Sequence, residues 1–137
     1  MKSKSPLKEL TLKELKHLAK FCLTYCKNTF GVNKRKRTEL EVHVIEKCFF
    51  DEKACGWYDP TENELYIILK HCKTVGDFTS TFIHEYTHYL QPCLTKYNKL
   101  LDQHGYVNHP FEIEAYKTEK IYNRKLLFEY RKTLKKW

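Results

Sequence analysis

The chain has 137 residues, a length that supports one domain with a single hydrophobic core. Hydrophobic residues make up 42% of it and aromatic residues 15%, which excludes a disordered composition, and no segment has the ~18 consecutive apolar residues of a membrane span. The net charge of +8 would suit a nucleic-acid partner, but lysines spread along amphipathic segments are typical of solvated helix faces, so we do not favour nucleic acid as the partner. We also expect no membrane partner and a monomeric protein.

The first predicted element is an amphipathic helix over residues 12–29. Thr11 and Glu14 form the T-x-x-E pattern of a capping box, apolar residues follow at helical spacing, and Gly31 provides a stop. Three predicted strands come next. LEVHVI, from residue 40, alternates apolar and polar residues as a half-buried strand does.

The other two strands lie in ACGWYDPTENELYIILK, on either side of a turn at residues 59–63. Its second half, LYIIL, is a continuous apolar run, and such a run favours a central position in the sheet. We therefore expect this third strand to lie in the middle of the sheet.

Two more helices follow the strands. Asp77 is a favourable N-cap and Pro92 cannot continue a helix, so the first of them is predicted over residues 78–91. The second begins at Pro110, with Asn108 or His109 as its cap, and continues to about residue 135. The sequence thus predicts one α+β domain over residues 1–137, with elements in the order α-β-β-β-α-α.

Six cysteines lie at positions 22, 26, 48, 55, 72 and 93. Three disulfides would require an oxidising compartment, and the N-terminus, MKSKSPLKELTLKELKHL, has no apolar stretch of the kind that a signal peptide carries. Cys22 and Cys26 share an apolar helix face, where cysteine packs as a small hydrophobic residue. We therefore expect reduced cysteines and a cytoplasmic protein.

The helix predicted over residues 78–91 carries the pattern H-E-x-x-H at His84, Glu85 and His88. Residues four apart lie on one helix face, so both imidazoles can reach one ion, and neutral imidazole is a good ligand for Zn²⁺. Glu85 is rotated around the helix from His84 and can take a proton from a water molecule on the zinc. We predict that His84 and His88 bind zinc and that Glu85 is the general base. A catalytic site of this kind needs a third protein ligand.

FIHEYTHYLQ, followed after a loop by HPFEIEAYKTEK, resembles the gluzincin metallopeptidases, particularly their minimal forms and the ImmA/IrrE-type peptidases. The resemblance covers residues 63–120 and implies a zincin-like domain. It also implies that the third ligand is a glutamate on the next helix, commonly with a small residue three positions later. Glu112 with Ala115 fits this form, and Glu114 is the rival. The two glutamates lie about 200° apart around a helix, so they cannot have the same role.

The resemblance has two further implications. NELYIIL would be an edge strand above the cleft, to which an extended substrate adds by main-chain pairing, in conflict with the central position that its apolar run favours. In several gluzincins an acidic residue four positions after the ligand orients a histidine, and here Tyr116 follows Glu112 and Thr118 follows Glu114 at that spacing. The residues that orient the ligands therefore differ from the family pattern.

Negative charge develops on the substrate carbonyl oxygen during peptide hydrolysis and needs a stabilising group. The candidates are Tyr106, Tyr116 and His104, which the loop and the last helix bring toward the motif.

His104 also supports a second interpretation. It follows His88 by sixteen residues, in LDQHGYVNH, and SprT-like proteases, which act on proteins associated with DNA, have a third histidine at a similar distance. The basic charge suits this alternative, but the glycine before the histidine is absent. An alternative from another class is a catalytically silent binding module on a zincin fold. Our prediction is a zinc metalloendopeptidase with Zn²⁺ as cofactor and a protein or peptide as substrate.

Overall fold

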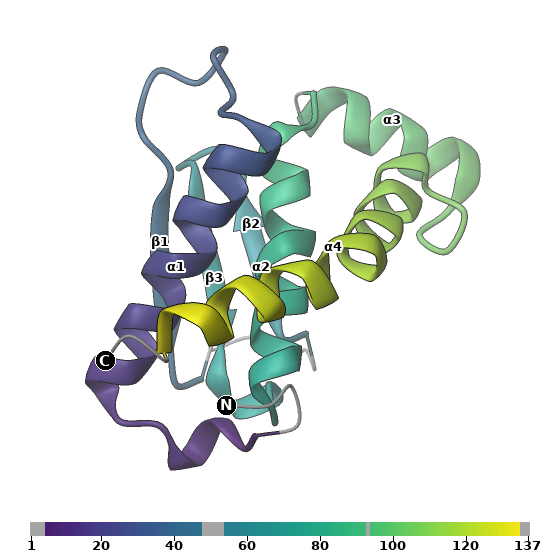
Figure 1. Ribbon diagram of the computed structural model, residues 1–137. Coiled ribbons are helices and arrows are strands. Elements are labelled where there is room, and N and C mark those ends of the chain that lie inside the picture. The colour runs from purple at the N-terminus through teal and green to yellow at the C-terminus, as the bar shows by residue number, and fades with distance from the viewer. Residues whose placement is uncertain (1–4, 48–53, 93, 135–137) are drawn as a thin grey trace.

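The computed structural model describes residues 5–47, 54–92 and 94–134 (Figure 1). This part of the chain forms four α-helices and a small mixed sheet, so the predicted α+β class is confirmed. The elements are η1 (Leu7–Glu9), α1 (Leu12–Phe30), β1 (Glu41–Ile45), β2 (Gly56–Asp59), β3 (Glu64–Ile68), η2 (Leu69–His71), α2 (Val75–Leu90), α3 (Leu94–His104) and α4 (Pro110–Leu134).

The strand order is β1-β3-β2, with β1 parallel and β2 antiparallel to β3. The apolar run is central, as its composition predicted, because Leu65 and Ile67 are fully buried against the helices. The edge position that the resemblance implied for it is therefore wrong, and β2 is the outer strand beside α2. Asn63 closes the β2–β3 turn at φ 55, a left-handed conformation that asparagine tolerates better than most residues.

Helix α2 is the central element of the core. It contacts β2 and β3 as well as α1 and α4 (Figure 1). Its side chains Phe78, Phe82, Ile83 and Tyr86 are fully buried, so the helix is fixed along its whole length. A helix held in this way can present polar groups at a fixed position.

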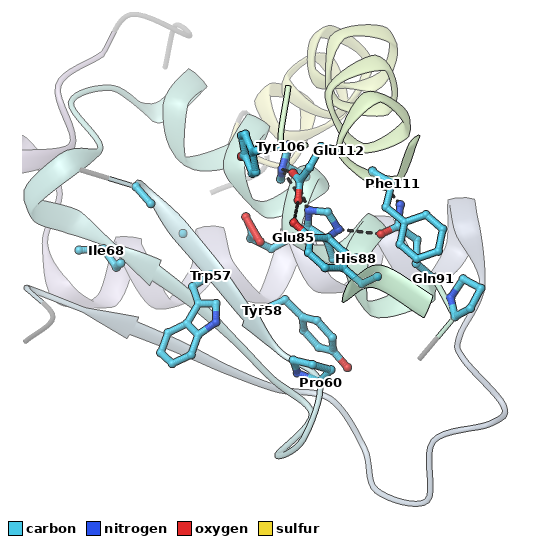
Figure 2. Close-up of a pocket in the computed structure, with 15 residues that line it drawn as sticks. Trp57, Tyr58, Pro60, Ile68, Glu85, His88, Gln91, Tyr106, Phe111 and Glu112 are labelled. Atoms are coloured by element: carbon cyan, nitrogen blue, oxygen red, sulfur yellow. Dashed lines mark hydrogen bonds and ion pairs between the residues drawn. The ribbon is translucent and has the colours of Figure 1, made fainter. Parts of the chain in front are cut away.

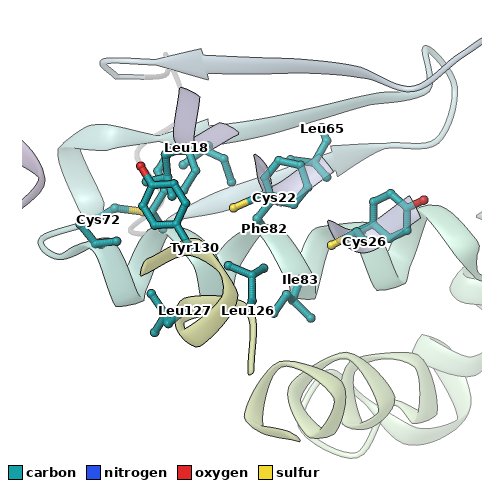
Figure 3. Close-up of a cluster of buried hydrophobic side chains, with 14 of the residues drawn as sticks. Leu18, Cys22, Cys26, Leu65, Cys72, Phe82, Ile83, Leu126, Leu127 and Tyr130 are labelled. Atoms are coloured by element: carbon teal, nitrogen blue, oxygen red, sulfur yellow. The ribbon is translucent and has the colours of Figure 1, made fainter. Parts of the chain in front are cut away.

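The cysteines of α1 lie in this core, as Figure 3 shows. Cys22 and Cys26 are fully buried, and burial raises the pKa of both thiols. The four cysteines in the described residues are free, whereas Cys48 and Cys93 lie outside them. Within the same residues, no helix is both long and apolar enough to cross a membrane.

The helix starts show one confirmed cap and one correction. At α1, Thr11 Oγ1 accepts the N–H of Glu14 and the Glu14 carboxylate accepts the N–H of Thr11, as the T-x-x-E pattern predicted. At α2, the N-cap is Thr74, and Asp77 is the third helical residue of a second capping box. The prediction of Asp77 as N-cap was wrong because threonine with a carboxylate three residues later satisfies two N–H groups rather than one.

Helix α3 was not predicted from the sequence, which indicated a loop between α2 and α4. It is tied to the start of α4 by His109, which is fully buried. The ring donates from Nε2 to the carbonyl oxygen of Tyr97 at 2.8 Å and accepts the N–H of Phe111 at Nδ1 at 3.0 Å. His109 thus caps α4, as expected, and also fixes α3 against it.

Candidate metal centre

Three side chains converge where α2 meets the first turn of α4 (Figure 2). Oε1 of Glu112 lies 3.1 Å from Nε2 of His84 and 3.1 Å from Nε2 of His88. The two Nε2 atoms are 3.2 Å apart. Two nitrogens and one oxygen from residues far apart in the sequence therefore surround a single point.

Polar groups on the far side of each ring influence which way its lone pair points. Nδ1 of His88 lies 2.7 Å from Oε1 of Gln91. The Gln91 amide is oriented by its Nε2, which donates to the carbonyl oxygen of Phe111 at 2.9 Å and to Glu114 at 3.3 Å. Since Gln91 Oε1 can only accept, His88 donates from Nδ1, and its Nε2 carries a lone pair when the ring is neutral.

His84 has a similar arrangement. Its Nδ1 lies 3.7 Å from Oε2 of Glu119, and the Ser80 hydroxyl donates to that same oxygen at 3.1 Å. The carboxylate favours a proton on Nδ1, which leaves the Nε2 lone pair facing Glu112. A carboxylate or amide oxygen behind each imidazole is the arrangement that orients histidine ligands in metal sites.

Lone pairs on two nitrogens and a carboxylate oxygen repel one another unless a positive charge lies between them. Burial alone would lower the pKa of His88, but the hydrogen bond to Glu112 and the charges of Glu85 and Glu112 raise it. The same negative potential attracts a cation. The cluster of His84, Glu85 and His88, with Glu112 facing it, can hold a metal ion.

Glu112 is buried, and its surroundings favour the ionised carboxylate. Burial would raise the pKa of its carboxyl group, but the adjacent imidazoles of His84 and His88 and the hydrogen bond from Tyr97 hold that pKa well below its usual range. The Tyr97 hydroxyl donates to Oε2 at 2.6 Å, so this oxygen is occupied and Oε1 is the one directed at the histidines.

Glu85 lines the same cavity, whose volume is about 510 Å³. Burial raises the pKa of its carboxyl group, which makes the carboxylate a better proton acceptor, while the His88 and His84 charges oppose the rise. In the described part of the chain no hydrogen bond ties this carboxylate to another side chain. It is therefore available to a molecule in the cavity.

Strand β2 forms one wall of the cavity because residue 56 has no side chain. A Cβ atom at Gly56 would lie 2.4 Å from Cγ2 of Thr81 and 3.2 Å from Cγ of Glu85. The strand backbone can therefore run directly beside the general-base candidate.

The other predicted residues lie around this centre. Glu114 is exposed and contacts Gln91, while His104 is exposed at the end of α3. No hydrogen bond or ion pair between described residues joins His104 to either motif histidine. The Tyr116 ring packs edge-on against His84 with centroids 4.5 Å apart, and its hydroxyl is 3.3 Å from that of Tyr106, which lines the cavity.

No protein-family model, curated protein or solved structure matches this chain.

Three residues at the centre were not identified from the sequence. Glu119 follows Glu112 by seven residues, two helical turns, so its position on the same side of α4 could have been recognised. Gln91 follows His88 by three residues on the same helix face, a weaker signal of the same kind. Tyr97 lies on the helix that was not predicted, and we find no sequence signal for its role.

Proposed function

We propose that this protein is a zinc-dependent metallopeptidase with a zincin-like domain, in which His84, His88 and Glu112 bind the metal and Glu85 is the general base. The observation that carries the proposal is the convergence of Glu112 Oε1 and the two Nε2 atoms within 3.2 Å of one another. The resemblance to gluzincins, which rests on the same residues, points to the same activity.

The donor set fits zinc. Zinc accepts imidazole nitrogen and carboxylate oxygen at about 2.0–2.2 Å in tetrahedral sites, so its ligand atoms lie roughly 3.3–3.5 Å from one another. The separations of 3.1 to 3.2 Å between these atoms are within a few tenths of an ångström of that spacing. When bound, zinc would supply a Lewis acid and lower the pKa of a water ligand to about 7.

The protein side chains then have separate tasks. Glu85 accepts the proton of the attacking water and delivers it to the leaving amine, a task that its buried position and raised pKa favour. Tyr106, which lines the cavity, and Tyr116, whose hydroxyl is 3.3 Å from that of Tyr106 and whose ring packs against His84, are our candidates for donating to the carbonyl oxygen as it gains negative charge. His104 is the third candidate for that task.

Strand β2 offers a means of holding the substrate. Its only strand partner in the described residues is β3, and its Gly56, Trp57 and Tyr58 line the cavity. An extended peptide that pairs with the outer edge of β2 would pass beside Glu85. Main-chain pairing holds the peptide bond in place without depending on its side chains.

The decisive experiment compares metal content and proteolysis in the wild type and Glu85→Gln. We expect both proteins to bind one zinc ion per chain and only the wild type to cleave denatured protein substrates. Full zinc content without cleavage that depends on Glu85 would instead identify a catalytically silent binding module. Metal content would be measured by mass spectrometry and cleavage by release of labelled fragments.

A second comparison identifies the third ligand. Glu112→Gln should lose zinc, whereas Glu114→Gln and His104→Ala should retain it. Loss of zinc in His104→Ala with retention in Glu112→Gln would favour the SprT-like alternative.

A further inference from the structure

The dense basic run of the sequence, residues 33–37, is attached to one end of the candidate active site. Asn33 is buried, its N–H donates to the Tyr89 hydroxyl at 3.0 Å, and its Nδ2 donates to the Tyr89 carbonyl oxygen at 2.9 Å. Arg35 donates from Nη2 to the carbonyl oxygen of Leu90 at 3.2 Å. These contacts fix the run to the last turn of α2, which also carries His88.

The same run also contacts the turn that follows β2. Lys36 Nζ donates to the carbonyl oxygen of Pro60 at 2.9 Å and lies 5.7 Å from the centre of the Tyr58 ring. Tyr58 and Pro60 both line the cavity of the metal centre (Figure 2). The basic run therefore bridges the two walls of the cavity, α2 and β2, at one end.

The four positive charges of this run are not engaged in ion pairs with the part of the chain that the structure describes. Across the described residues, no carboxylate forms an ion pair with Lys34, Arg35, Lys36 or Arg37. The cavity lining contains two carboxylates, Glu85 and Glu112, and both belong to the metal centre. Arg35 and Lys36 use only some of their N–H groups on backbone oxygens and retain donors for a ligand. Four positive charges at the end of a cleft attract an anionic ligand to that end.

We propose that residues 33–37 form a subsite for acidic side chains of the peptide substrate, about four residues from the bond that is cleaved. The spacing follows from β2: Gly56 lies beside Glu85, Pro60 is four residues further along, and an extended chain advances about 3.3 Å per residue, or roughly 13 Å in all. This inference rests on the proposed peptidase activity and assigns it a substrate class, polypeptides with an acidic cluster on one side of the cleavage site.

A peptide suits this position better than a nucleic acid does. The edge of β2 leads from Glu85 to the basic run and offers N–H and carbonyl groups at the spacing of a polypeptide backbone. Carboxylates carried by such a strand would reach the unused donors of Arg35 and Lys36. A nucleic acid backbone has no N–H groups with which to pair along the strand.

The test uses peptides that share one central sequence. One carries Asp-Glu-Asp three to five residues before the cleaved bond, one carries the same block after it, and one carries Asn-Gln-Asn in both places. The zinc-loaded full chain should cleave one acidic peptide with a kcat/KM about tenfold above that of the amide peptide, given about threefold for each exposed ion pair. High salt should abolish most of this preference.

Three variants locate the effect. Lys36→Gln should lower the ratio of acidic to amide kcat/KM about threefold, and the double variant Lys34→Gln/Arg37→Gln should lower it by a similar factor through the loss of two neighbouring charges. The double variant keeps the hydrogen bond between Lys36 and Pro60, so it tests the charge of the run even if Lys36→Gln unfolds the turn. Lys16→Gln/Lys20→Gln, which removes two exposed charges from α1, is the matched control and should keep the wild-type ratio.

Binding separates this inference from the proposed activity. The affinity of Glu85→Gln for each labelled peptide, measured by fluorescence anisotropy, should show the same acidic preference. If no peptide is cleaved, the peptidase proposal fails, while the affinity ratio still tests the subsite. Equal affinities for acidic and amide peptides would overturn it. The subsite would also be overturned if the α1 control lost the acidic preference to the same extent as the variants of the basic run. Tighter binding of a single-stranded oligonucleotide of the same charge than of the acidic peptide would overturn it as well.

Discussion

Histidine and carboxylate groups meet both at the centre between α2 and α4 and on the outer face of the sheet, within the described residues. On the sheet, His43 Nε2 lies 3.5 Å from Glu41 and 3.6 Å from Glu64, and their side chains are 39%, 67% and 22% exposed. At the centre, His84 and Glu112 are 3.1 Å apart with side chains 10% and 6% exposed. The two groups have similar chemistry and differ in their contact with water.

The difference lies in what holds each histidine. At the centre, Gln91 and Glu119 stand behind the two imidazoles and direct the Nε2 atoms toward Glu112. On the sheet, Nε2 of His43 has no hydrogen-bond partner in the described residues, and Glu64 accepts a hydrogen bond from Tyr66. The sheet group also brings its ligand atoms close enough to hold an ion, but its side chains are more exposed to competing water and Glu64 is engaged by Tyr66, so we expect it to bind a metal more weakly than the centre does.

The strongest way to test this comparison is to remove one histidine from each group. His88→Ala should lower zinc affinity by at least about 100-fold, because the loss of a direct ligand exceeds the 10- to 100-fold cost of losing an outer partner. His43→Ala should leave zinc affinity unchanged. Competition with a chromophoric chelator measures both, and an equal loss in the two variants would contradict the assignment.

Metal removal should destabilise the fold through the buried centre. At free zinc 100-fold above its dissociation constant, the bound ion contributes about 2.7 kcal/mol to the free energy of unfolding, provided that the unfolded chain does not bind it. Chelation should therefore lower the thermal midpoint of the wild type and of His43→Ala by the same amount. Calorimetry with and without chelator measures it, and a midpoint insensitive to zinc would exclude a metal held in the folded state.

The groups behind the histidines should have smaller effects. Glu119→Ala leaves His84 Nδ1 without its carboxylate neighbour, and we expect zinc affinity to fall by about 10- to 100-fold. Glu64→Ala is the matched change on the sheet and should have no effect on zinc. If Glu119→Ala binds zinc as the wild type does, Glu119 does not orient the ligand.

The smallest predicted effects are changes in stability caused by substitutions on the two faces of β2. Gly56→Ala places a Cβ atom 2.4 Å from Thr81 Cγ2, and overpacking of this kind costs about 1–3 kcal/mol. The ring of Trp57 faces the other way, stacked on Tyr66 with centroids 5.3 Å apart, and Trp57→Phe should cost less. Urea denaturation measures both variants. Thr81→Ser removes the clashing methyl group and should partly restore the stability of Gly56→Ala.

The sequence predicts those parts of the fold that depend on short-range patterns. The capping box at Thr11, the central position of the apolar strand and the pairing of His84 with His88 follow from residues within a few positions of each other. Helix α3 cannot be predicted in this way, because it is attached to α4 by the buried ring of His109, five residues after the helix ends. From the sequence, a histidine before a proline is equally consistent with an exposed N-cap that makes no contact with another helix.

The choice between Glu112 and Glu114 as third ligand also depends on more than short-range sequence patterns. Helical geometry established that the two glutamates face different ways, but it could not say which of them faces α2. That orientation depends on how α4 is rotated against α2, which is set by the burial of Ala115 and Leu126 together with the hydrogen bond from Gln91 to the Phe111 carbonyl oxygen. The edge strand implied by the resemblance failed for a related reason, since strand order depends on pairing between segments distant in the sequence.

The contact between His88 and Glu112 spans 24 residues of chain, and α3 lies entirely within that span. An ion bound to both side chains would close this segment into a loop, as a disulfide does. In the chain-entropy description of such cross-links, closing a loop of this length stabilises the folded state by about 3 kcal/mol. Zinc would then serve α3 as a removable cross-link, and amide hydrogen exchange in that helix should report whether the metal is present.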